Sequence, residues 1–313
     1  MYDKIVVPLD GSELAEGVIP HVAELVRDRA SQVCLLAVAS TGRRAPPVLA
    51  DLLSSAAGTQ EEKQRVEQEL AAYLDTVAEK LEPVVNARVS VRFGQPADEI
   101  LALASEVNAE LIVMSTHGRS GIRRWVFGTV ADRILHGASC PLLLVRTTTD
   151  QGEIAYQRIL VPLDGSQTAE QILPYVGALI RPNHTRVFLV SVLTNGLSDR
   201  TVALLTSIPA GLQLSTTSLP KAEVQLRAYM RSVAAALRER GAFVQIDIRR
   251  GSPADEILTH AADVDADLIT MTTHGLSGPS RWVYGDVAGK VLHSAQRPVL
   301  LVRPTAREQK SER

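Results

Sequence analysis

The amino-acid sequence predicts two tandem, doubly wound α/β domains, each with a five-stranded parallel sheet and helices on both faces. The sequence contains an internal repeat, since KIVVPLDGS at residues 4–12 is followed by the similar RILVPLDGS at residues 158–166. Residues 94–146 also align with residues 251–303 without gaps, and more than half of the aligned residues are identical. This repeat is far longer than the roughly 20–50 residues of a solenoid unit, so it indicates a duplicated domain. We expect domains at residues 1–149 and 154–305, separated by the polar stretch Thr147–Gln157.

A second observation is that short apolar runs alternate with longer amphipathic stretches, which is the pattern of a parallel sheet covered by helices. Several of the short runs are apolar throughout, as expected for strands buried on both faces. In the first copy the strands are expected, in order, at Ile5–Pro8, Val33–Val38, Val89–Phe93, Leu111–Met114 and Leu142–Val145.

The amphipathic stretches predict the helices. The clearest carries apolar residues at helical spacing in both copies, namely Val66, Leu70, Leu74, Val77 and Leu81 in the first and Leu226, Met230, Val233 and Leu237 in the second. Two further helices are expected over Ala97–Val107 and Val130–Leu135. Pro20, matched by Pro174, falls inside the first helical pattern, so we expect that helix to restart or kink there.

Some parts of the two copies match poorly. Residues 41–59 and 194–221 are therefore expected to be variable surface segments. Each copy also ends in a short apolar strand, Leu142–Val145 and Val299–Val302, of the kind that pairs at a sheet edge. We expect the two copies to pack as an internal pseudo-dimer through these edges, and the same pairing would allow a homodimer.

Composition excludes several classes of function. A net charge of −2 and an aromatic content of 4% argue against nucleic-acid binding. No run approaches the roughly 18 apolar residues of a membrane span. The start, MYDKIVVPLD, enters a strand-like run at once, so we expect no signal segment and a cytoplasmic protein. The two cysteines, Cys34 and Cys140, form no CxxC pair, which argues against a disulfide framework or a cysteine zinc site.

The expected sheet also indicates where a ligand would bind. In doubly wound sheets, ligands lie beyond the carboxyl ends of the strands, near the point where the strand order reverses. Three features fall at strand ends: Pro8-Leu9-Asp10-Gly11-Ser12, Gly94-Gln95-Pro96, and the loop from Ser115-Thr116-His117-Gly118 to Gly128-Thr129. The last leads into a helix N-terminus, where free backbone N–H groups suit a phosphate.

The same residues also have purely structural interpretations. Asp10-Gly11-Ser12 reads as a tight turn with a serine helix cap, and Thr129 with Asp132 reads as a variant capping box that needs no ligand. Other side chains near these loops have structural or undecided roles: His117 and His274 as loop-orienting residues, Trp125 and Trp282 as packing residues, His136 and His293 at a helix C-terminus, and Arg123-Arg124 as a phosphate clamp or a solvated pair.

No catalytic constellation is evident. The sequence has neither a GxxxxGK[ST] phosphate loop nor a GxGxxG fingerprint, and no Ser/His/Asp order stands out. We therefore predict no catalytic residues and no resident metal ligands, and any ATP hydrolysis should be slow.

Together, PLDGS, GxPADEIL and THG-x9-G-[ST]-V-A resemble the universal stress protein family, here in tandem over essentially the whole chain. The ATP-binding branch of that family carries G-x2-G-x9-G-[ST] in its last loop. The first copy reads Ser115-x2-Gly118-x9-Gly128-Thr129, with serine in place of the first glycine. The resemblance implies a Rossmann-like, cytoplasmic stress-response regulator that binds ATP, ADP or AMP together with Mg²⁺. It also implies a protein partner, which the sequence does not identify.

The resemblance also implies which residues contact the nucleotide. Asp10 would face the ribose or base, and the backbone at Val38 and Gly94 would border the adenine. Gly118, Gly128, Thr129 and Val130 would cradle the phosphates, and Pro8, Met114, Ser115 and Arg123 complete the expected first-copy site. The second-copy residues expected to correspond are Pro162, Asp164, Val192, Gly251, Gly275 and Gly285. The alternatives are a nucleotide-free scaffold of the same fold and a slow ATPase.

The second copy departs from this motif. It reads Thr272-x2-Gly275-x9-Gly285-Asp286, so a carboxylate replaces Thr129. Two unit negative charges about 4 Å apart repel by roughly 4 kcal/mol at an effective dielectric near 20, although magnesium between them would relieve this. We therefore expect the first copy to be the better nucleotide site.

Overall fold

The computed structural model describes residues 1–27, 29–40, 60–81, 85, 87–116, 128–146, 154–194, 219–273 and 285–304. The chain divides into two units: Met1–Tyr156 with Gln296–Leu300, and Gln157–Ala295 with Leu301–Arg313. We call the part that carries strands β1–β5 the first half and the part that carries β6–β10 the second half. The expected boundaries at residues 1–149 and 154–305 stay a prediction, as does the packing of the halves as a pseudo-dimer.

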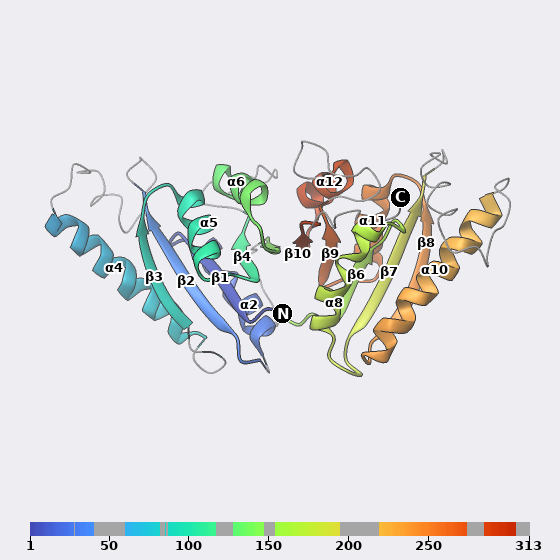
Figure 1. The fold of residues 1–313 in the computed structure, drawn as a ribbon, viewed down its shortest axis with the longest axis horizontal. Helices are drawn as coiled ribbons and strands as arrows, with labels where there is room; N and C mark the ends of the chain where they lie inside the picture. The colour runs from blue at the N-terminus through green and yellow to red at the C-terminus, as the bar shows by residue number, and fades with distance from the viewer. Residues whose placement is uncertain are drawn as a thin grey trace, which may run out of the picture. The chain divides into compact units, whose positions relative to one another are not determined.

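The described part of the first half holds five parallel strands in the order β3-β2-β1-β4-β5, so the predicted doubly wound sheet is confirmed. Figure 1 shows the first four of these strands in that order. The strand order reverses between β1 and β4, which are direct neighbours. All five strands lie where the apolar runs predict them, within two residues at each end: β1 (Lys4–Leu9), β2 (Gln32–Ala39), β3 (Ala87–Phe93), β4 (Leu111–Ser115) and β5 (Leu142–Val145).

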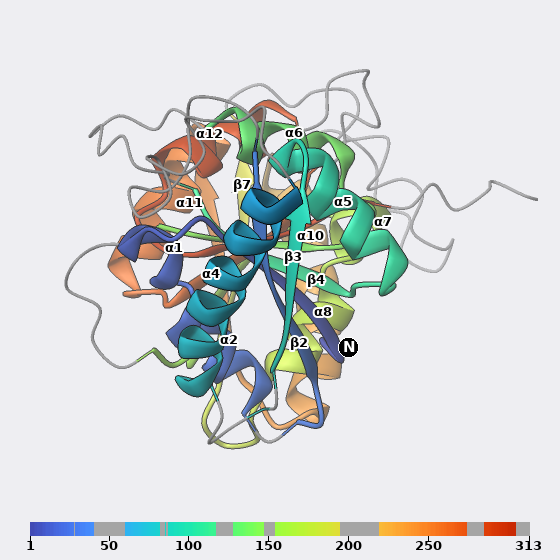
Figure 2. The ribbon, with the colours of Figure 1, turned by 90° about the vertical axis from the view of Figure 1, so that its left-hand side faces the viewer.

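Helices cover both faces of this sheet. Figure 2 shows α1, α2 and α4 on one side of β3 and α5 and α6 on the other. The predicted apolar stripe of α4 is confirmed, because Val66, Leu70, Leu74 and Val77 are buried, as is Leu81 just beyond the helix end. The helices of the first half are α1 (Glu13–Glu16), α2 (Ile19–Val26), α4 (Gln60–Glu79), α5 (Pro96–Glu106) and α6 (Thr129–Gly137).

Pro20 marks a restart and not a kink. Helix α1 ends at Glu16 and α2 begins at Ile19, which places Pro20 in the first turn of α2. A proline is tolerated there because the first amides of a helix have no intrahelical acceptor. Pro174 lies at the same point of α8 in the second half.

The second half repeats this architecture, with its strands in the order β10-β9-β6-β7-β8. Its long helix buries Leu226, Met230, Val233 and Leu237, as predicted. The strands are β6 (Arg158–Pro162), β7 (Arg186–Leu193), β8 (Phe243–Arg250), β9 (Leu268–Thr272) and β10 (Val299–Val302). The helices are α7 (Gln167–Glu170), α8 (Leu173–Leu179), α10 (Leu219–Glu239), α11 (Pro253–Asp263) and α12 (Asp286–Ser294).

The two segments that the sequence predicts to be variable surface stretches lie largely outside the described residues. Residues 41–59 lie outside the described residues, as do residues 195–218. However, α10 begins at Leu219, so the last three residues of the segment expected to be a variable surface stretch are helical. In the described ranges, no helix is both long and apolar enough to cross a membrane.

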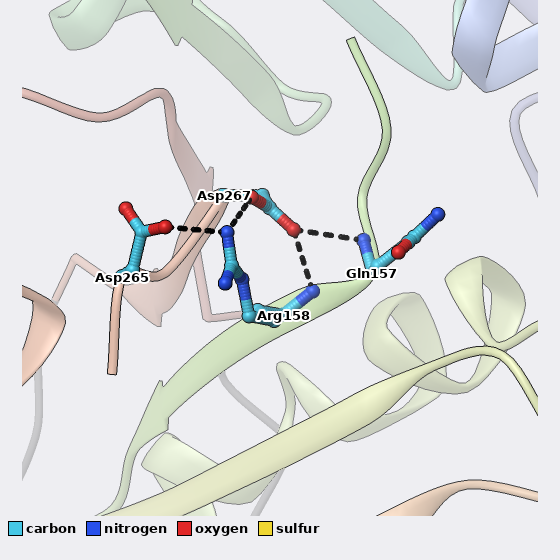
Figure 3. Close-up of polar contacts among 4 residues, drawn as sticks. All are labelled: Gln157, Arg158, Asp265 and Asp267. Atoms are coloured by element: carbon cyan, nitrogen blue, oxygen red, sulfur yellow. Dashed lines mark hydrogen bonds and ion pairs between the residues drawn. The ribbon is translucent and has the colours of Figure 1, made fainter. Parts of the chain in front are cut away.

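A carboxylate ties the first strand of the second half to its neighbour (Figure 3). Asp267, directly before β9, accepts hydrogen bonds through Oδ2 from the backbone N–H groups of Gln157 (3.1 Å) and Arg158 (2.7 Å). The Arg158 guanidinium in turn donates to Asp265 at 2.6 Å. The first half uses the same device more simply, because Glu110 accepts from the Asp3 N–H at 3.1 Å. These contacts fix the central strand pair at its amino end, opposite the end where a ligand is expected.

A buried histidine anchors the segment that follows residue 153. His21 on α2 is 3% exposed, and its Nδ1 lies 2.8 Å from the Tyr156 hydroxyl, which is itself buried. The two rings also stack, with centroids 5.9 Å apart. Burial disfavours the imidazolium form and lowers the pKa of His21 from 6.5 to about 4.

This pKa predicts acid sensitivity. Between pH 6.5 and 4 the unfolded chain binds a proton at His21 that the folded protein does not, so stability is full above that window and falls as the pH drops through it. We expect a loss on the order of 3 kcal/mol from pH 7 to pH 4 that His21→Gln does not show. Denaturant unfolding of both proteins across this range measures it, and parallel pH curves would contradict the assignment.

Candidate functional site

The carboxyl ends of the strands in the first half meet at one edge of the sheet because the strands are parallel. The middles of β1, β2 and β4 are buried, whereas Pro8, Val38 and Ser115 near their ends are half-buried. Met114, one residue earlier on β4, is 6% exposed. In the second half, Pro162 and Val192 lie at the matching ends of β6 and β7 and are also half-buried. The structure therefore brings these predicted residues to the expected edge within each half.

Asp10 organises the turn after β1. Its Oδ1 accepts hydrogen bonds from the Ser12 N–H (3.0 Å) and the Ser12 hydroxyl (2.5 Å), and Gly11 between them has a φ of 76°. Ser12 Oγ accepts from the Ala15 N–H at 3.1 Å and so caps α1. The interpretation as a tight turn with a serine cap is confirmed. Both bonds to Asp10 use Oδ1, so a ligand can reach Oδ2 of this exposed carboxylate without breaking the turn.

The second half repeats this turn closely. Asp164 Oδ1 accepts from the Ser166 N–H at 3.0 Å and from its hydroxyl at 2.6 Å, and Gly165 has a φ of 84°. Ser166 caps α7 through the Ala169 N–H. The PLDGS motif thus has a complete structural role in both halves.

Gly94 also has a structural role. Its N–H donates to the Ala39 carbonyl at 3.1 Å, so it continues the pairing of β3 with β2. Its φ is 155°, and a Cβ built on it would lie 2.6 Å from Glu99 Oε1. Gly251 repeats both features, with a φ of 145° and Glu256 Oε1 at 2.9 Å. A ligand at this point can therefore meet the Gly94 carbonyl or Cα, but not its N–H.

Helix α6 begins one residue earlier than the capping-box interpretation requires. Gly128 is the N-cap and Thr129 is the first helical residue, so the interpretation of Thr129 and Asp132 as a capping box is wrong. At its helical position the threonine side chain no longer reaches back to the first amides. Among the described residues, no side chain caps this end of α6, and Val130 follows as a half-buried residue. The first amides of α6 can therefore bind an anion.

Gly128 differs from Gly94 in a way that bears on function. Its φ of −58° suits any residue, and a Cβ built on it would meet no described atom within 4 Å. Neither the backbone conformation nor the described packing therefore requires glycine here. A side chain at this position would instead fill the space in front of the helix N-terminus.

The equivalent end of α12 has the same form with a different charge. Gly285 is its N-cap, and its N–H donates to the Thr273 carbonyl at 2.8 Å, which joins the two ends of the intervening loop. Asp286 is the first helical residue and is exposed. It is therefore no cap, but its charge lies directly at the helix N-terminus.

The histidines of the last helical turns are structural, as predicted. His136 Nδ1 lies 2.6 Å from the Asp132 carbonyl, and His293 Nδ1 lies 2.6 Å from the Gly289 carbonyl. A carbonyl only accepts, so Nδ1–H is the donor in each case.

Several predicted residues lie outside the described residues. They are the expected phosphate-loop residues Gly118, Arg123 and Gly275, together with Arg124, His117, His274, Trp125 and Trp282. Within the described ranges, no group of three or more His, Cys, Asp or Glu side chains is arranged to hold a metal ion.

Sequence reasoning missed one feature near this edge. Tyr73 on α4 and Tyr229 on α10 each have a buried hydroxyl, and each interacts with the glutamate that ends the first helix of its half, Glu16 or Glu170. The two tyrosines occupy equivalent positions in the repeated amphipathic helix, and this recurrence is the sequence signal that could have identified them.

Comparison with known proteins shows the family and supports the fold. The model of the universal stress protein family matches residues 1–146 and again residues 155–303. A universal stress protein of Methanothermobacter thermautotrophicus is 34% identical over 147 residues, which cover 47% of this chain and 97% of that protein. One from Mycobacterium tuberculosis is 27% identical over 218 residues, 67% of each chain. The crystal structure of a universal stress protein from Archaeoglobus fulgidus superposes with a TM-score of 0.69 at 18% identity, covers 98% of each chain, and supports the fold.

The fold and the repeated strand-end motifs therefore define a tandem, Rossmann-like α/β protein. The chain belongs to the universal stress protein family and carries two copies of its domain.

The structural role of Gly94 predicts the effect of a side chain there. Gly94→Ala should destabilise the ligand-free protein by about 1–3 kcal/mol, because the new Cβ meets Glu99 and the backbone is strained. Adding Glu99→Ala should recover the part due to the contact but not the part due to the backbone. Denaturant unfolding measures both, with Gly251→Ala as the matched variant. An unchanged stability for Gly94→Ala would mean that the glycine serves a ligand alone.

Proposed function

We propose that this chain binds an adenine nucleotide, ATP with Mg²⁺, at the carboxyl edge of its first half and acts as a cytoplasmic stress-response regulator through a protein partner. The observation that carries this proposal is the N-terminus of α6, which no side chain in the described ranges caps and which follows Gly128, a glycine that the described fold does not require. The family resemblance points to the same end of the sheet.

Each part of the nucleotide has a matching group. The first amides of α6 and the positive end of its dipole suit the phosphates. The exposed Asp10 carboxylate suits the ribose hydroxyls, because the turn engages Oδ1 and a carboxylate Oδ2 can accept further hydrogen bonds. The half-buried Val38 side chain and the Cα of Gly94 offer apolar contact to a base. In this proposal Mg²⁺ arrives with the phosphates.

The two halves differ in where they place negative charge. Asp286 is the first residue of α12, whereas the acidic residue of the first turn of α6 is Asp132, three residues further along. At 1.5 Å per residue this moves the charge roughly 4.5 Å along the helix from the phosphates. The first half is therefore the better site, and Asp286 would require a cation at the second.

A nucleotide-free scaffold is the second candidate. It is favoured by the complete structural roles of Asp10 and Gly94, which need no ligand. Calorimetry with ATP, ADP and AMP, with and without Mg²⁺, separates the two candidates once bound small molecules have been removed. Mass spectrometry of what the purified protein releases identifies the nucleotide, and a turnover assay tests for the slow hydrolysis. No binding at millimolar ligand would favour the scaffold.

Gly128→Ser tests the proposal directly. Serine is a better N-cap than glycine by a few tenths of a kcal/mol, so the variant should be as stable as the parent or slightly more stable. The serine hydroxyl would accept a hydrogen bond from a backbone N–H group that otherwise binds phosphate. The affinity for ATP should therefore fall at least about tenfold. Calorimetry and denaturant unfolding report the two effects separately. A scaffold predicts the change in stability alone.

The charge difference between the halves gives a second test. Thr129→Asp should weaken ATP binding at the first half by roughly 2–4 kcal/mol through charge repulsion. The fold should be unaffected, because an acidic residue is favoured in the first turn of a helix. Thr129→Asn is the matched control with the same shape and no charge.

The reciprocal Asp286→Thr should strengthen binding at the second half. If Asp286 instead holds Mg²⁺, its loss weakens binding there, and titration with and without Mg²⁺ distinguishes these outcomes. Equal, magnesium-independent binding by both unmutated halves would contradict the asymmetry.

A further inference from the structure

The long helix of each half has a regularly spaced exposed face as well as a buried one. Helix α4 lies alongside β3 and α10 lies alongside β8, each within its own half (Figure 1). On the side away from the buried stripe, exposed residues recur at intervals of four, three and four, the spacing at which two helices pair in a coiled coil. We call these rows the outer faces: Gln68, Ala72, Asp75 and Glu79 on α4, and Val224, Ala228, Arg231 and Ala235 on α10.

The two outer faces carry opposite charges. Asp75 and Arg231 occupy the same position in the repeated helix. Glu79 adds a negative charge four residues after Asp75, and the exposed Arg227 adds a positive charge four residues before Arg231. Residues four apart lie on one side of a helix, separated by roughly 6 Å along its axis. The acidic pair on α4 therefore matches the basic pair on α10 in spacing and is opposite in sign.

Most of this charge is not neutralised by neighbouring side chains. In the described part of the chain, Asp75, Glu79 and Arg231 take part in no ion pair. Arg227 lies 3.1 Å from Glu223, one turn earlier on the same helix, and an exposed pair of this kind contributes little in water. Val224, at the start of the outer face of α10, is 58% exposed and adds apolar surface to the row. Charge and apolar surface thus remain available to another molecule.

The shape of the outer faces allows close contact between helices. Ala72 and Ala228 are equivalent and exposed, and each lies within its row. Alanine at this point lets two helix axes approach closely enough for the charged side chains to pair across the contact. Each row extends over roughly 16 Å of helix, so the two rows also match in length.

The charge of the whole halves favours the same pairing. Acidic residues outnumber basic residues in the range 1–156, whereas basic residues outnumber acidic residues in the range 157–313. The first half of one copy therefore attracts the second half of another, and two identical halves repel each other.

We propose that the outer face of α10 docks on the outer face of α4 in a second copy of this chain, with Arg227 and Arg231 against Asp75 and Glu79. The occupant is a second copy because the chain itself carries an acidic face that matches the basic one in charge, spacing and length. This contact is separate from the edge-strand pairing expected from the sequence, and it requires no nucleotide.

Sedimentation of the intact protein over a range of concentrations tests the proposal. The parent should self-associate, and raising the salt from about 20 mM to about 500 mM should weaken this association at least about tenfold, because salt screens exposed charges. Association that salt does not weaken would overturn the proposal. A parent that stays monomeric at low salt would also overturn it, and would leave the outer face of α10 to an acidic segment of a different protein.

Charge-reversal variants identify the two faces. Arg231→Glu should weaken self-association at least about tenfold, because it places a negative charge opposite Asp75, and Asp75→Arg should do the same on the other face. A mixture of these two variants should associate again, because the unchanged α10 of one meets the unchanged α4 of the other.

Lys290→Glu is the matched control, since it reverses one exposed charge on α12 and should associate as the parent does. Denaturant unfolding confirms that each variant is folded. A mixture that fails to associate would overturn the proposal, as would a Lys290→Glu variant that is weakened as much as Arg231→Glu.

Discussion

The pairing of β1 with β4 is the contact on which the arrangement of the first half depends. These strands are far apart in sequence but are parallel neighbours, with Ile5 opposite Leu111. Their pairing reverses the strand order and sets the turn after β1 beside the carboxyl end of β4 at one sheet edge. At the opposite edge, Glu110 ties the start of β1 to the start of β4, as Asp267 does for β6 and β9. The second half obeys the same constraint and so offers a second edge of the same form.

In the proposed function, residues at this edge would serve the fold and a ligand at once. Asp10 closes a turn with Oδ1 and leaves Oδ2 out of that turn, and the half-buried Gly94 continues the strand pairing. Such a dual role means that loss of binding in a variant is informative only beside a measured stability. Gly128 differs from these residues, because it is the N-cap of α6 and the described structure does not require glycine there. A substitution at Gly128 can therefore test binding with little effect on stability.

Duplication lets the two halves share a scaffold and differ in charge. Backbone features recur in both, including the positive φ of Gly11 and Gly165 and the N-cap glycines of α6 and α12. The differences lie in side chains: Thr129 against Asp286 at the helix start, and Lys80, which pairs with Glu16, against Ala236. Changes of this kind alter electrostatics without disturbing hydrogen-bonded backbone, so one half can lose or change a ligand while both keep the fold.

The sequence by itself determined the fold class, the duplication, the strands and the main helices. Apolar periodicity and turn residues act locally, and the same pattern of both occurs in each of the two copies. It also located the strand ends where Pro8, Asp10, Val38 and Gly94 lie. Only the tertiary structure decided that α6 starts behind Gly128, that Glu99 fills the space beside Gly94, and that Tyr156 docks on His21. The approach of Tyr73 on α4 to Glu16 on α1 belongs to the same group. Each of these depends on how packed helices bring together side chains distant along the chain or set where a helix begins, and local sequence pattern does not encode that approach.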